Sequence, residues 1–361
     1  MKILHVITLS EIGGAQSVVL NLVKESVKEG HTVMIASSPN GEMWTLLSPE
    51  VIQKPIKFLQ RKINFVRDVQ ALIELNRIDK DFQPDVIHLH SSKTGLLGRL
   101  AFSPSKIVYT VHGFDSIRLK FRKLLFLEKL LKKSASYIVA VSQYDYNNLI
   151  KSGIKDNVRC IYNGLSDYHL ESFNPLGNHE SIFLSKFSGA DNFRVLCIAR
   201  LAPQKRFDLF CQVAEQLKDH NIDFYWVGNK EPVLNLPKNV QCLGEIPDAH
   251  KLLRYVDLLV LPTDYEGMPI CILEALCYSK PVIASDVGGI VEILNGKNGK
   301  AVPNVADNFS RQILLYKENV DMYRNASKEA RRSYDLRFTV NTMYQAYLKL
   351  YNTILEQAVD F

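Results

Sequence analysis

Short apolar runs alternate with amphipathic stretches along most of the chain, and this alternation constrains the fold more than any other feature. The runs are almost continuously apolar and rich in β-branched residues, which is typical of parallel strands covered on both faces. In the first half they are Ile3–Ile7, Thr32–Ala36, Val86–Leu89, Ile107–Val111 and Tyr137–Val141. Amphipathic stretches such as Ser17–Lys28 and Arg67–Ile78 lie between them. The pattern predicts an α/β fold of βαβ units with doubly wound parallel sheets.

The alternation lapses between Leu165 and Asp191, a polar segment that we interpret as a linker. A long helix is predicted near Val340–Gln357. Apolar runs resume after the linker as Val195–Ala199, Asp223–Val227, Val240–Leu243, Leu258–Leu261 and Pro281–Ala284. A chain of 361 residues can form two domains of roughly 150 residues each. We therefore predict domains at 1–170 and 190–340, and a C-terminal helix at 341–361 that packs back on the first domain.

Composition limits the class of protein without selecting a partner. The formal net charge is +6, a mildly basic balance that suits several kinds of anionic partner. No nucleic-acid-binding motif is present, and the basic residues are not interleaved with a stacking platform, so we expect no nucleic-acid partner. The six cysteines show no C-x-x-C spacing and lie mostly in apolar runs, which predicts free thiols. They are Cys160, Cys197, Cys211, Cys242, Cys271 and Cys277.

The N-terminal apolar run is too short and too polar for a signal peptide, because His5 and Glu11 interrupt it. The sequence has no window of about 20 apolar residues that would cross a membrane. We therefore expect a cytoplasmic protein.

Two motifs follow predicted strands and precede predicted helices, where ligands bind in open α/β sheets. Gly13-Gly14 precedes a helix whose free N–H groups and positive dipole end suit an anion, although an ordinary turn would also use two glycines. The second motif, Ala199–Arg206, contains Arg200 and Lys205. These cations would neutralise a diphosphate if they converge in one loop; the alternative is two solvated surface cations.

The third motif, from Glu266 to Glu274, carries the strongest signal. It follows the strand Leu258–Leu261, and seven residues separate its two glutamates. The residues after Glu266 occupy a predicted helix entrance, where unpaired backbone N–H groups suit sugar hydroxyls, and Pro269 fits the first turn. Glu274 is predicted two turns inside the helix. If it is buried it needs a hydrogen-bonding partner such as a ribose diol; the alternative is an exposed helix glutamate.

Further motifs extend the pattern over nearly the whole chain. They are Val111-His112-Gly113, Tyr162-Asn163-Gly164, Val287-Gly288-Gly289 and Asn298-Gly299. In this order the motifs resemble the retaining glycosyltransferases of family 4, of the bacterial surface-polysaccharide type. The resemblance implies GT-B architecture, with two Rossmann-like domains that face each other across a cleft. It also implies transfer of a hexose or N-acetylhexosamine from a nucleotide-sugar donor, in particular a UDP-sugar, to a lipid-linked saccharide (such as a polyprenyl-diphosphate saccharide) or an oligosaccharide acceptor.

The resemblance gives roles to individual residues. Glu274 resembles the carboxylate that binds the donor ribose, and Glu266 the one that stabilises positive charge at the anomeric carbon. Arg200 and Lys205 resemble the cations that hold the donor diphosphate and ease its departure. Gly14 resembles the glycine whose backbone touches the distal phosphate.

Other roles complete the expected site. The backbone at Gly267, Met268, Pro269 and Ile270 resembles the segment that grips the sugar hydroxyls. His112 resembles a histidine that lies beside the donor sugar and contacts its 6-hydroxyl. We expect no metal or other cofactor, because the two cations at the diphosphate supply the charge that a magnesium ion would, and Asp264 lacks a D-x-D partner.

The chain departs from the family pattern at Gln16 and Ser17, where many members carry an acidic and then a basic residue, so the contacts to the acceptor stay open. Gly-Met-Pro after Glu266 is common in members that use UDP-hexoses or UDP-N-acetylhexosamines. Three other functions stay open: a UDP-sugar epimerase on the same scaffold, a GDP-mannose-dependent mannosyltransferase, and a non-catalytic nucleotide-sugar-binding subunit.

Two features outside these motifs also suggest partners. His88 and His90 alternate in one predicted strand, as a metal pair or as a polar strand end. Segment 116–133 is predicted to be a helix that contacts an anionic membrane peripherally; the alternative is a solvated basic face. Its basic stripe is Arg118, Arg122, Lys129 and Lys133, flanked by Phe121, Leu125 and Phe126, with Leu124, Leu127 and Leu131 facing the core.

Overall fold

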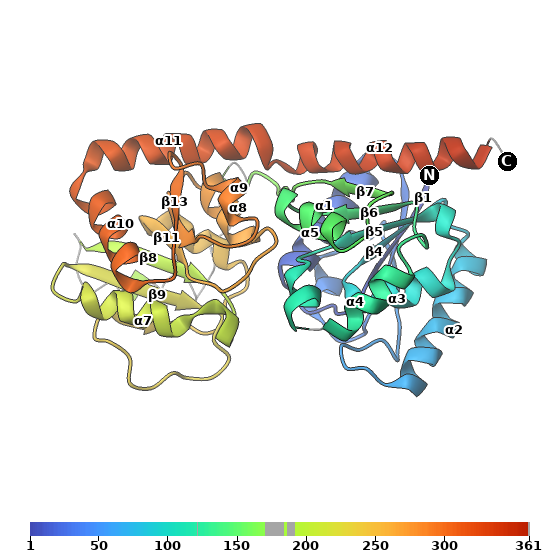
Figure 1. Ribbon diagram of the computed structural model, residues 1–361, viewed down its shortest axis with the longest axis horizontal. Helices are drawn as coiled ribbons and strands as arrows, with labels where there is room; N and C mark the ends of the chain where they lie inside the picture. Colours follow the sequence, from blue (N-terminus) through green and yellow to red (C-terminus); the bar gives the residue numbers. More distant parts are fainter. Residues whose placement is uncertain (121, 170–183, 186–191, 360–361) are drawn as a thin grey trace. The chain divides into compact units, whose positions relative to one another are not determined.

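The computed structural model describes residues 1–120, 122–169, 184–185 and 192–359, and Figure 1 traces their helices and strands. Contacts divide the chain into two compact units. The first unit contains residues 1–166 and 339–361, and the second contains residues 167–338. Most of the predicted linker, Leu165–Asp191, lies outside the described residues.

The first unit is built on a seven-stranded sheet in the order β3-β2-β1-β4-β5-β6-β7, and every neighbouring pair is parallel. The strands are β1 (Lys2–Ile7), β2 (Thr32–Ser37), β3 (Ile52–Pro55), β4 (Val86–His90), β5 (Ile107–Val111), β6 (Tyr137–Ala140) and β7 (Val158–Cys160). The five predicted runs form β1, β2, β4, β5 and β6. The apolar pattern missed the two edge strands, because β3 is exposed throughout and β7 has three residues.

Helices cover both faces of this sheet. They are α1 (Gly14–Lys28), η1 (Glu42–Leu46), α2 (Phe65–Phe82), α3 (Ser92–Ala101), η2 (Pro104–Lys106), the π-helical turn η3 (Ser116–Lys120), α4 (Arg122–Leu130), α5 (Gln143–Lys151) and α12 (Val340–Val359). Apolar residues of α2, α3 and α5, such as Leu75, Leu97 and Leu149, pack in one core cluster. Val19 and Val23 of α1 belong to a second cluster, which places α1 on the opposite face.

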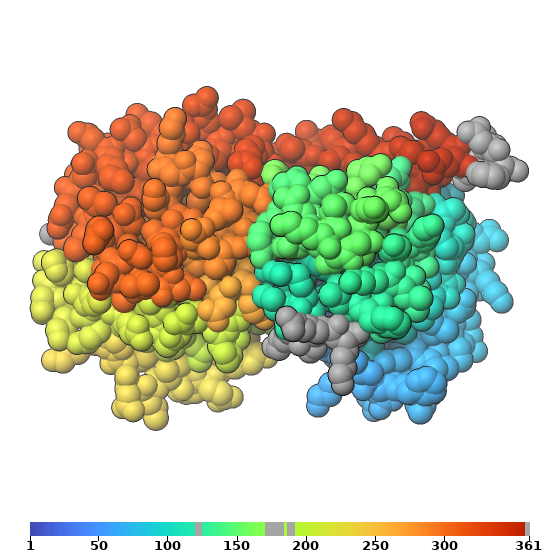
Figure 2. All heavy atoms as spheres, viewed as in Figure 1, coloured from blue at the N-terminus to red at the C-terminus, as the bar shows by residue number. Residues whose placement is uncertain are grey.

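Helix α12 packs on the first unit, beside α1 and over β4. Its Tyr347 and Tyr351 are fully buried, and its atoms line one edge of this unit (Figure 2). A parallel bridge joins Leu165 to Thr339 just before the helix. A Cβ at Gly164 would lie 2.2 Å from the Thr339 carbonyl oxygen, so the glycine of the Tyr162-Asn163-Gly164 motif permits this close approach.

The second unit is built on a six-stranded parallel sheet in the order β10-β9-β8-β11-β12-β13. Its strands are β8 (Phe193–Ile198), β9 (Ile222–Val227), β10 (Val240–Cys242), β11 (Leu258–Leu261), β12 (Val282–Ser285) and β13 (Gly299–Val302). Its helices are η4 (Pro203–Lys205), α7 (Phe207–Gln216), η5 (Ala249–Tyr255), α8 (Ile270–Cys277), α9 (Ile290–Ile293), α10 (Ala306–Glu318) and α11 (Val320–Arg337). The predicted runs form β8 to β12.

Both sheets are doubly wound, as the sequence predicts. The strand order reverses between β1 and β4 in the first unit and between β8 and β11 in the second. In open parallel sheets, ligands bind outside the carboxyl ends of the strands at such a switch point. The six cysteines are free thiols, as predicted. No helix in the described part of the chain is long and apolar enough to cross a membrane.

Candidate active site

The switch point of the second unit brings together Lys205, which ends the loop after β8, and Glu266, which lies after β11. The Lys205 ammonium forms an ion pair with the Glu266 carboxylate, and the two side chains are only 16% and 13% exposed. Burial alone would lower the pKa of Lys205, but the charge of Glu266 and its hydrogen bond outweigh that effect and raise the pKa. Lys205 is therefore a fixed cation. An ammonium has three N–H donors, so two remain after one is used in the hydrogen bond to Glu266.

A hydrogen-bond network holds the Glu266 loop. Gln204 Nε2 donates to the Tyr265 carbonyl (2.6 Å), and the Thr263 amide donates to Ser285 Oγ (2.7 Å). Asn304 Nδ2 donates to the Thr263 carbonyl (2.9 Å). Sequence analysis missed these supporting residues. Their one signal is that Thr263 and Ser285 are polar residues at the carboxyl ends of buried strands.

Gly288 explains part of the Val287-Gly288-Gly289 motif. Its φ is +56°, and a Cβ there would lie 1.9 Å from the Glu266 carbonyl oxygen. The Gly289 amide donates to the same oxygen at 3.3 Å. The turn after β12 therefore presses against the backbone of Glu266, which only glycine permits at position 288.

Helix α8 begins one residue later than the sequence suggests. Pro269 is the N-cap and Ile270 the first helical residue, so the prediction that Pro269 lies in the first turn is wrong. Glu274 is the fifth residue of α8, little more than one turn inside it, and not two turns as predicted. The cause is that Gly267 and Met268 remain in the loop, where both are buried.

Glu274 is the unpaired carboxylate of the site. It follows the buried Leu273 and precedes the buried Ala275, and its carboxylate has no hydrogen-bond or ion-pair partner among the described residues. Burial, with a smaller contribution from Asp248, raises its pKa to about 7. A carboxylate held in this state gains from any ligand hydroxyl that donates to it.

Arg200 lies in the same loop as Lys205 but is exposed, and no ion pair or hydrogen bond to its guanidinium occurs within the described residues. The structure therefore brings Lys205 and Glu266 into contact, while Arg200 and Glu274 have no side-chain partner in the part of the chain that it describes. A fixed cation, a free cation and an unpaired carboxylate at one switch point can together bind an anion and a hydroxyl-bearing group.

In the first unit, Gly14 is the first residue of α1, and both Gly13 and Gly14 are exposed. No side chain caps this helix start, so its N–H groups are open to a ligand. The Gln16 side chain donates to the Leu9 carbonyl (2.8 Å), and Ser17 Oγ donates to the Gly13 carbonyl (3.2 Å). The two residues that depart from the family pattern therefore brace their own loop.

His112 follows β5 and is half-buried. Its Nε2 lies 3.1 Å from Nδ1 of His90, whose Nε2 lies 3.1 Å from Nδ1 of His5. Burial lowers the pKa of His112 to about 4. His112 thus belongs to a buried histidine cluster that sequence analysis identified only as His88 and His90.

His5, His88 and His90 each place one nitrogen within 4.8 Å of the others, close enough for a shared metal ion. Both His88 nitrogens are already bonded at 2.7 Å, to Tyr351 and Thr110, and the rings of His88 and His90 are tilted by 35° with centroids 3.9 Å apart. Metal ligands need in-plane lone pairs that converge on one point, so an ion here would have to break these bonds.

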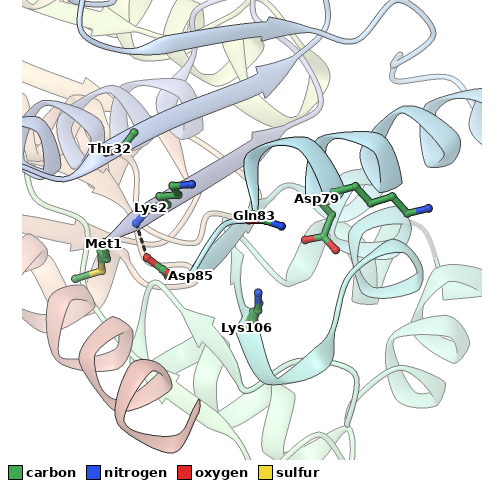
Figure 3. A pocket seen from close by; sticks show the side chains of 8 residues that line it. Met1, Lys2, Thr32, Asp79, Gln83, Asp85 and Lys106 are labelled. Carbon is green, nitrogen blue, oxygen red and sulfur yellow. Dashed lines mark hydrogen bonds between the residues drawn. The ribbon is translucent and has the colours of Figure 1, made fainter. Parts of the chain in front are cut away.

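A cavity of about 760 Å³ lies at the other end of the first sheet (Figure 3). It is lined by residues at the amino-terminal ends of the strands and the end of α2, including Lys2, Asp79, Gln83 and Lys106. The two lysines donate to backbone carbonyls, Lys2 to Phe82 and Lys106 to Pro84. The cavity is therefore separate from the predicted site residues.

Comparison with known proteins gives matches over both units. The family model described as Glycosyltransferase Family 4 matches residues 12–167, and the model described as Glycosyl transferases group 1 matches residues 192–319. The chain is 30% identical over 351 residues to the UDP-Gal:alpha-D-GlcNAc-diphosphoundecaprenol alpha-1,3-galactosyltransferase of Escherichia coli, covering 90% of this chain and 87% of the relative.

Two further comparisons agree. The chain is 29% identical over 324 residues to the N,N'-diacetylbacillosaminyl-diphospho-undecaprenol alpha-1,3-N-acetylgalactosaminyltransferase of Campylobacter jejuni, covering 83% of this chain and 85% of the relative. The solved structure of Anabaena HepE in complex with UDP-glucose superposes with a TM-score of 0.82 at 22% identity, over 100% of both chains. This similarity supports the two-domain fold.

Replacing Glu274 with glutamine tests the cost of its burial. Because the pKa is raised, ionisation destabilises the fold, and stability is lost as the pH rises from the ordinary glutamate value through about 7. We expect E274Q to gain about 1 to 3 kcal/mol over the wild type at pH 8, at about 1.4 kcal/mol per pH unit of displacement, and no gain near pH 4. Thermal unfolding across this range measures the difference. A gain independent of pH, or an equal gain in the exposed control E318Q, would contradict the assignment.

Replacing Gly288 with alanine tests the contact with the Glu266 backbone. Gly296 is a matched control because its φ is +82° and nothing lies within 4 Å of its added Cβ. Both variants incur backbone strain, but G288A also forces a clash, so we expect it to lose about 1 to 3 kcal/mol more than G296A. Urea unfolding of both proteins gives the comparison, and equal losses would show that the close approach has no energetic weight.

Proposed function

The chain belongs to glycosyltransferase family 4, and we propose that it transfers a hexose or N-acetylhexosamine from a UDP-sugar, with retention, to a hydroxyl of a lipid-linked saccharide in bacterial surface-polysaccharide synthesis. The observation that carries the proposal is the arrangement of a fixed cation, Lys205, and an unpaired carboxylate, Glu274, at one switch point. The Escherichia coli and Campylobacter jejuni relatives support the acceptor class, since both names specify a diphosphoundecaprenol-linked sugar. The first also names a UDP-sugar donor.

Donor binding begins with Glu274. The two ribose hydroxyls donate to its carboxylate, which has no protein partner in the described residues. A hydrogen bond to a charged group contributes about 1.5 to 3 kcal/mol, and here it also relieves the cost of burying the charge. Binding therefore favours the ionised form of Glu274 over the neutral form that burial favours.

The diphosphate is bound by cations of the loop after β8. Lys205 offers its two remaining N–H donors, and Arg200 offers a planar fork that matches phosphate oxygens. These residues supply positive charge to the leaving group, so the proposal needs no resident metal ion.

The chemical step proceeds through a loose transition state in which the bond from the anomeric carbon to the diphosphate breaks before the acceptor bond is complete. Positive charge develops at the anomeric carbon, and Glu266 stabilises it from a fixed position. The acceptor hydroxyl attacks from the side of the departing diphosphate, whose oxygen takes the hydroxyl proton. The products are UDP and a glycoside of retained configuration. The roles of Gly14 and His112 stay predictions from the family resemblance.

The alternatives differ in what is released. An epimerase would return an isomerised nucleotide-sugar, and a non-catalytic subunit would release nothing. The relatives named above are transferases by name, which favours transfer. A competition experiment would identify a GDP-mannose donor, because GDP would then bind in preference to UDP.

Activity measurements test the donor assignment. Purified protein is given UDP-galactose, UDP-N-acetylgalactosamine, UDP-glucose or GDP-mannose together with a polyprenyl-diphosphate N-acetylglucosamine, and nucleotide release is followed. We expect turnover with a UDP-sugar, and a fall in kcat/KM of about 100-fold or more in K205A, because the developing charge on the leaving group loses its fixed cation. The exposed control K238A should keep wild-type activity. Release of GDP alone, or equal activity of K205A and K238A, would refute the assignment.

Contact with the membrane belongs to the same proposal, since the acceptor is lipid-linked. Phe126 and Leu130 of α4 are 70% and 66% exposed, and Lys129 and Lys133 beside them are also exposed. Residues four apart lie on one helix face, so this end of segment 116–133 presents an apolar pair with basic neighbours, which suits an anionic bilayer.

The rest of the segment differs from the predicted stripe. Arg118 forms an ion pair with Asp115 at 2.8 Å and bonds to Tyr144, so it braces the first unit. Leu125 packs against the core instead of flanking the stripe. Phe121 and the side chains of Arg122 and Leu124 lie outside the described residues.

Sedimentation with vesicles tests this surface. We expect binding to phosphatidylglycerol vesicles, weaker binding to neutral phosphatidylcholine vesicles, and loss of most binding in F126S/L130S, because that variant removes the apolar anchor. The control L234S/L336S changes two leucines that are 81% and 66% exposed in the second unit, and it should bind as the wild type does. Absence of wild-type binding, or equal losses in both variants, would exclude this surface.

A further inference from the structure

Three histidines of the first unit form a hydrogen-bonded chain from the core to the end of the sheet. Nδ1 of His5 lies 3.1 Å from Nε2 of His90, and Nδ1 of His90 lies 3.1 Å from Nε2 of His112. The register of β1 and β4 explains the alignment, because Ile7 pairs with His90 and side chains two apart on a strand share a face. His5, two residues before Ile7, therefore points to the same side as His90.

The two ends of this chain have different surroundings. His5 is fully buried, and its Nε2 has no hydrogen-bond partner among the residues that the structure describes. His112 is partly exposed, and its Nδ1 has no hydrogen-bond partner among the described residues. This nitrogen is not buried, so it is accessible to solvent. The inner end is closed and the outer end is open to a ligand.

When the three histidines are neutral and both hydrogen bonds between them are made, their protons can be arranged in two ways. If every Nδ1 is protonated, His5 donates to His90, His90 donates to His112, and His112 keeps an outward Nδ1–H; the closed end is then an unpaired acceptor. In the reverse order, the closed end is a buried N–H without an acceptor. Orphaned buried N–H donors are rarer in proteins than unsatisfied acceptors, so the first order is favoured.

The surroundings keep the chain neutral. Burial lowers the pKa of His5 to about 3, and burial together with His88, His112 and His5 holds the pKa of His90 well below its usual value. Thr110, Tyr347 and Tyr351, which bond to each other or to His88 beside the chain, are neutral hydroxyl groups. None of the hydrogen bonds described for these histidines goes to a carboxylate.

We propose that His90, backed by His5, is a positioning residue that holds His112 as its neutral Nδ1–H tautomer, so that His112 presents one N–H donor to an oxygen of the bound sugar. The ligand in this proposal rests on the proposed function. A neutral donor also suits that reaction, since an imidazolium would repel the positive charge that develops on the sugar. Which nitrogen of a histidine carries the proton is set by the bond that the other nitrogen makes, and here that bond is to His90.

Nitrogen-15 NMR of the histidine side chains tests the tautomer without any substrate. Long-range proton–nitrogen correlations at pH 7 should show His112 protonated on Nδ1 alone in the wild type. H90N should preserve this state, because its amide nitrogen lies near the position of Nδ1 and still donates to His112. H90L removes the donor, so both neutral tautomers should appear.

H88N is the matched control, since His88 is equally buried on the same strand but bonds to Tyr351 and Thr110 instead of to the chain. It should leave the His112 tautomer unchanged. Protonation of wild-type His112 on Nε2, or an unchanged tautomer in H90L, would overturn the proposal. If H90L does not fold, the wild-type spectrum decides. One equivalent of Zn²⁺ retained by the wild type in dialysis would also overturn it, because the ion would occupy the nitrogens of the chain.

Kinetics separate this proposal from the proposed function. With UDP-galactose, or with whichever UDP-sugar turns over, H90L should lose about tenfold in kcat, the effect of one hydrogen bond made to the reacting sugar, while H90N and H88N stay within about threefold. A wild-type protein with the expected tautomer that turns over no nucleotide-sugar would refute the proposed function and leave the positioning role of His90 intact. The expected tautomers with equal kcat in H90L and H90N would refute the contact between His112 and the sugar.

Discussion

The ion pair between Lys205 and Glu266 is the interaction on which the strand ends of the second unit depend. It joins the loop after β8 to the loop after β11 at the switch point of the sheet. Two charges that are mostly removed from water are tolerated only when each is paired and the remaining polar groups are satisfied. Thr263, Ser285 and Asn304 meet the second condition, and Gly288 lets the neighbouring turn press on the Glu266 backbone.

Glu274, which lies in helix α8 after Glu266, differs from Glu266 because no cation pairs with it in the described residues. It is half-buried and has no partner among the described residues, and burial raises its pKa to about 7. Natural proteins retain such unsatisfied groups mainly where a ligand supplies the missing bond. The second unit therefore has one carboxylate that is already positioned by the protein and one that awaits a ligand, and the two have different parts in the proposed reaction.

In the first unit, hydrogen bonds between neutral histidines have a comparable role. Its histidine chain is closed at His5 and open at His112, and helix α12 seals its side through Tyr347 and Tyr351. A hydrogen-bond network in a buried site is directional because each donor needs an acceptor. The core of the sheet can thus determine the protonation of a side chain at its surface.

Local patterns determined the strands and the order of the motifs. β5 and β11 were predicted with their observed bounds because buried parallel strands need continuous apolar runs. The spacing of the two glutamates, the glycines at the start of α1 and the position of Lys205 after a strand were equally local. The edge strands β3 and β7 escaped because neither carries an apolar run, and the entry into α8 was misplaced by one residue because a proline can be the N-cap or the first helical residue.

The sequence by itself thus determined two doubly wound sheets and the residue types at their carboxyl ends. Only the tertiary structure decided which of those residues are partners. Lys205 meets Glu266 across 61 residues, His5 meets His90 across 85, and His88 meets Tyr351 across 263. Pattern along a chain records which face of an element is buried, but contacts between elements depend on strand order and register, which arise only when the whole sheet is assembled.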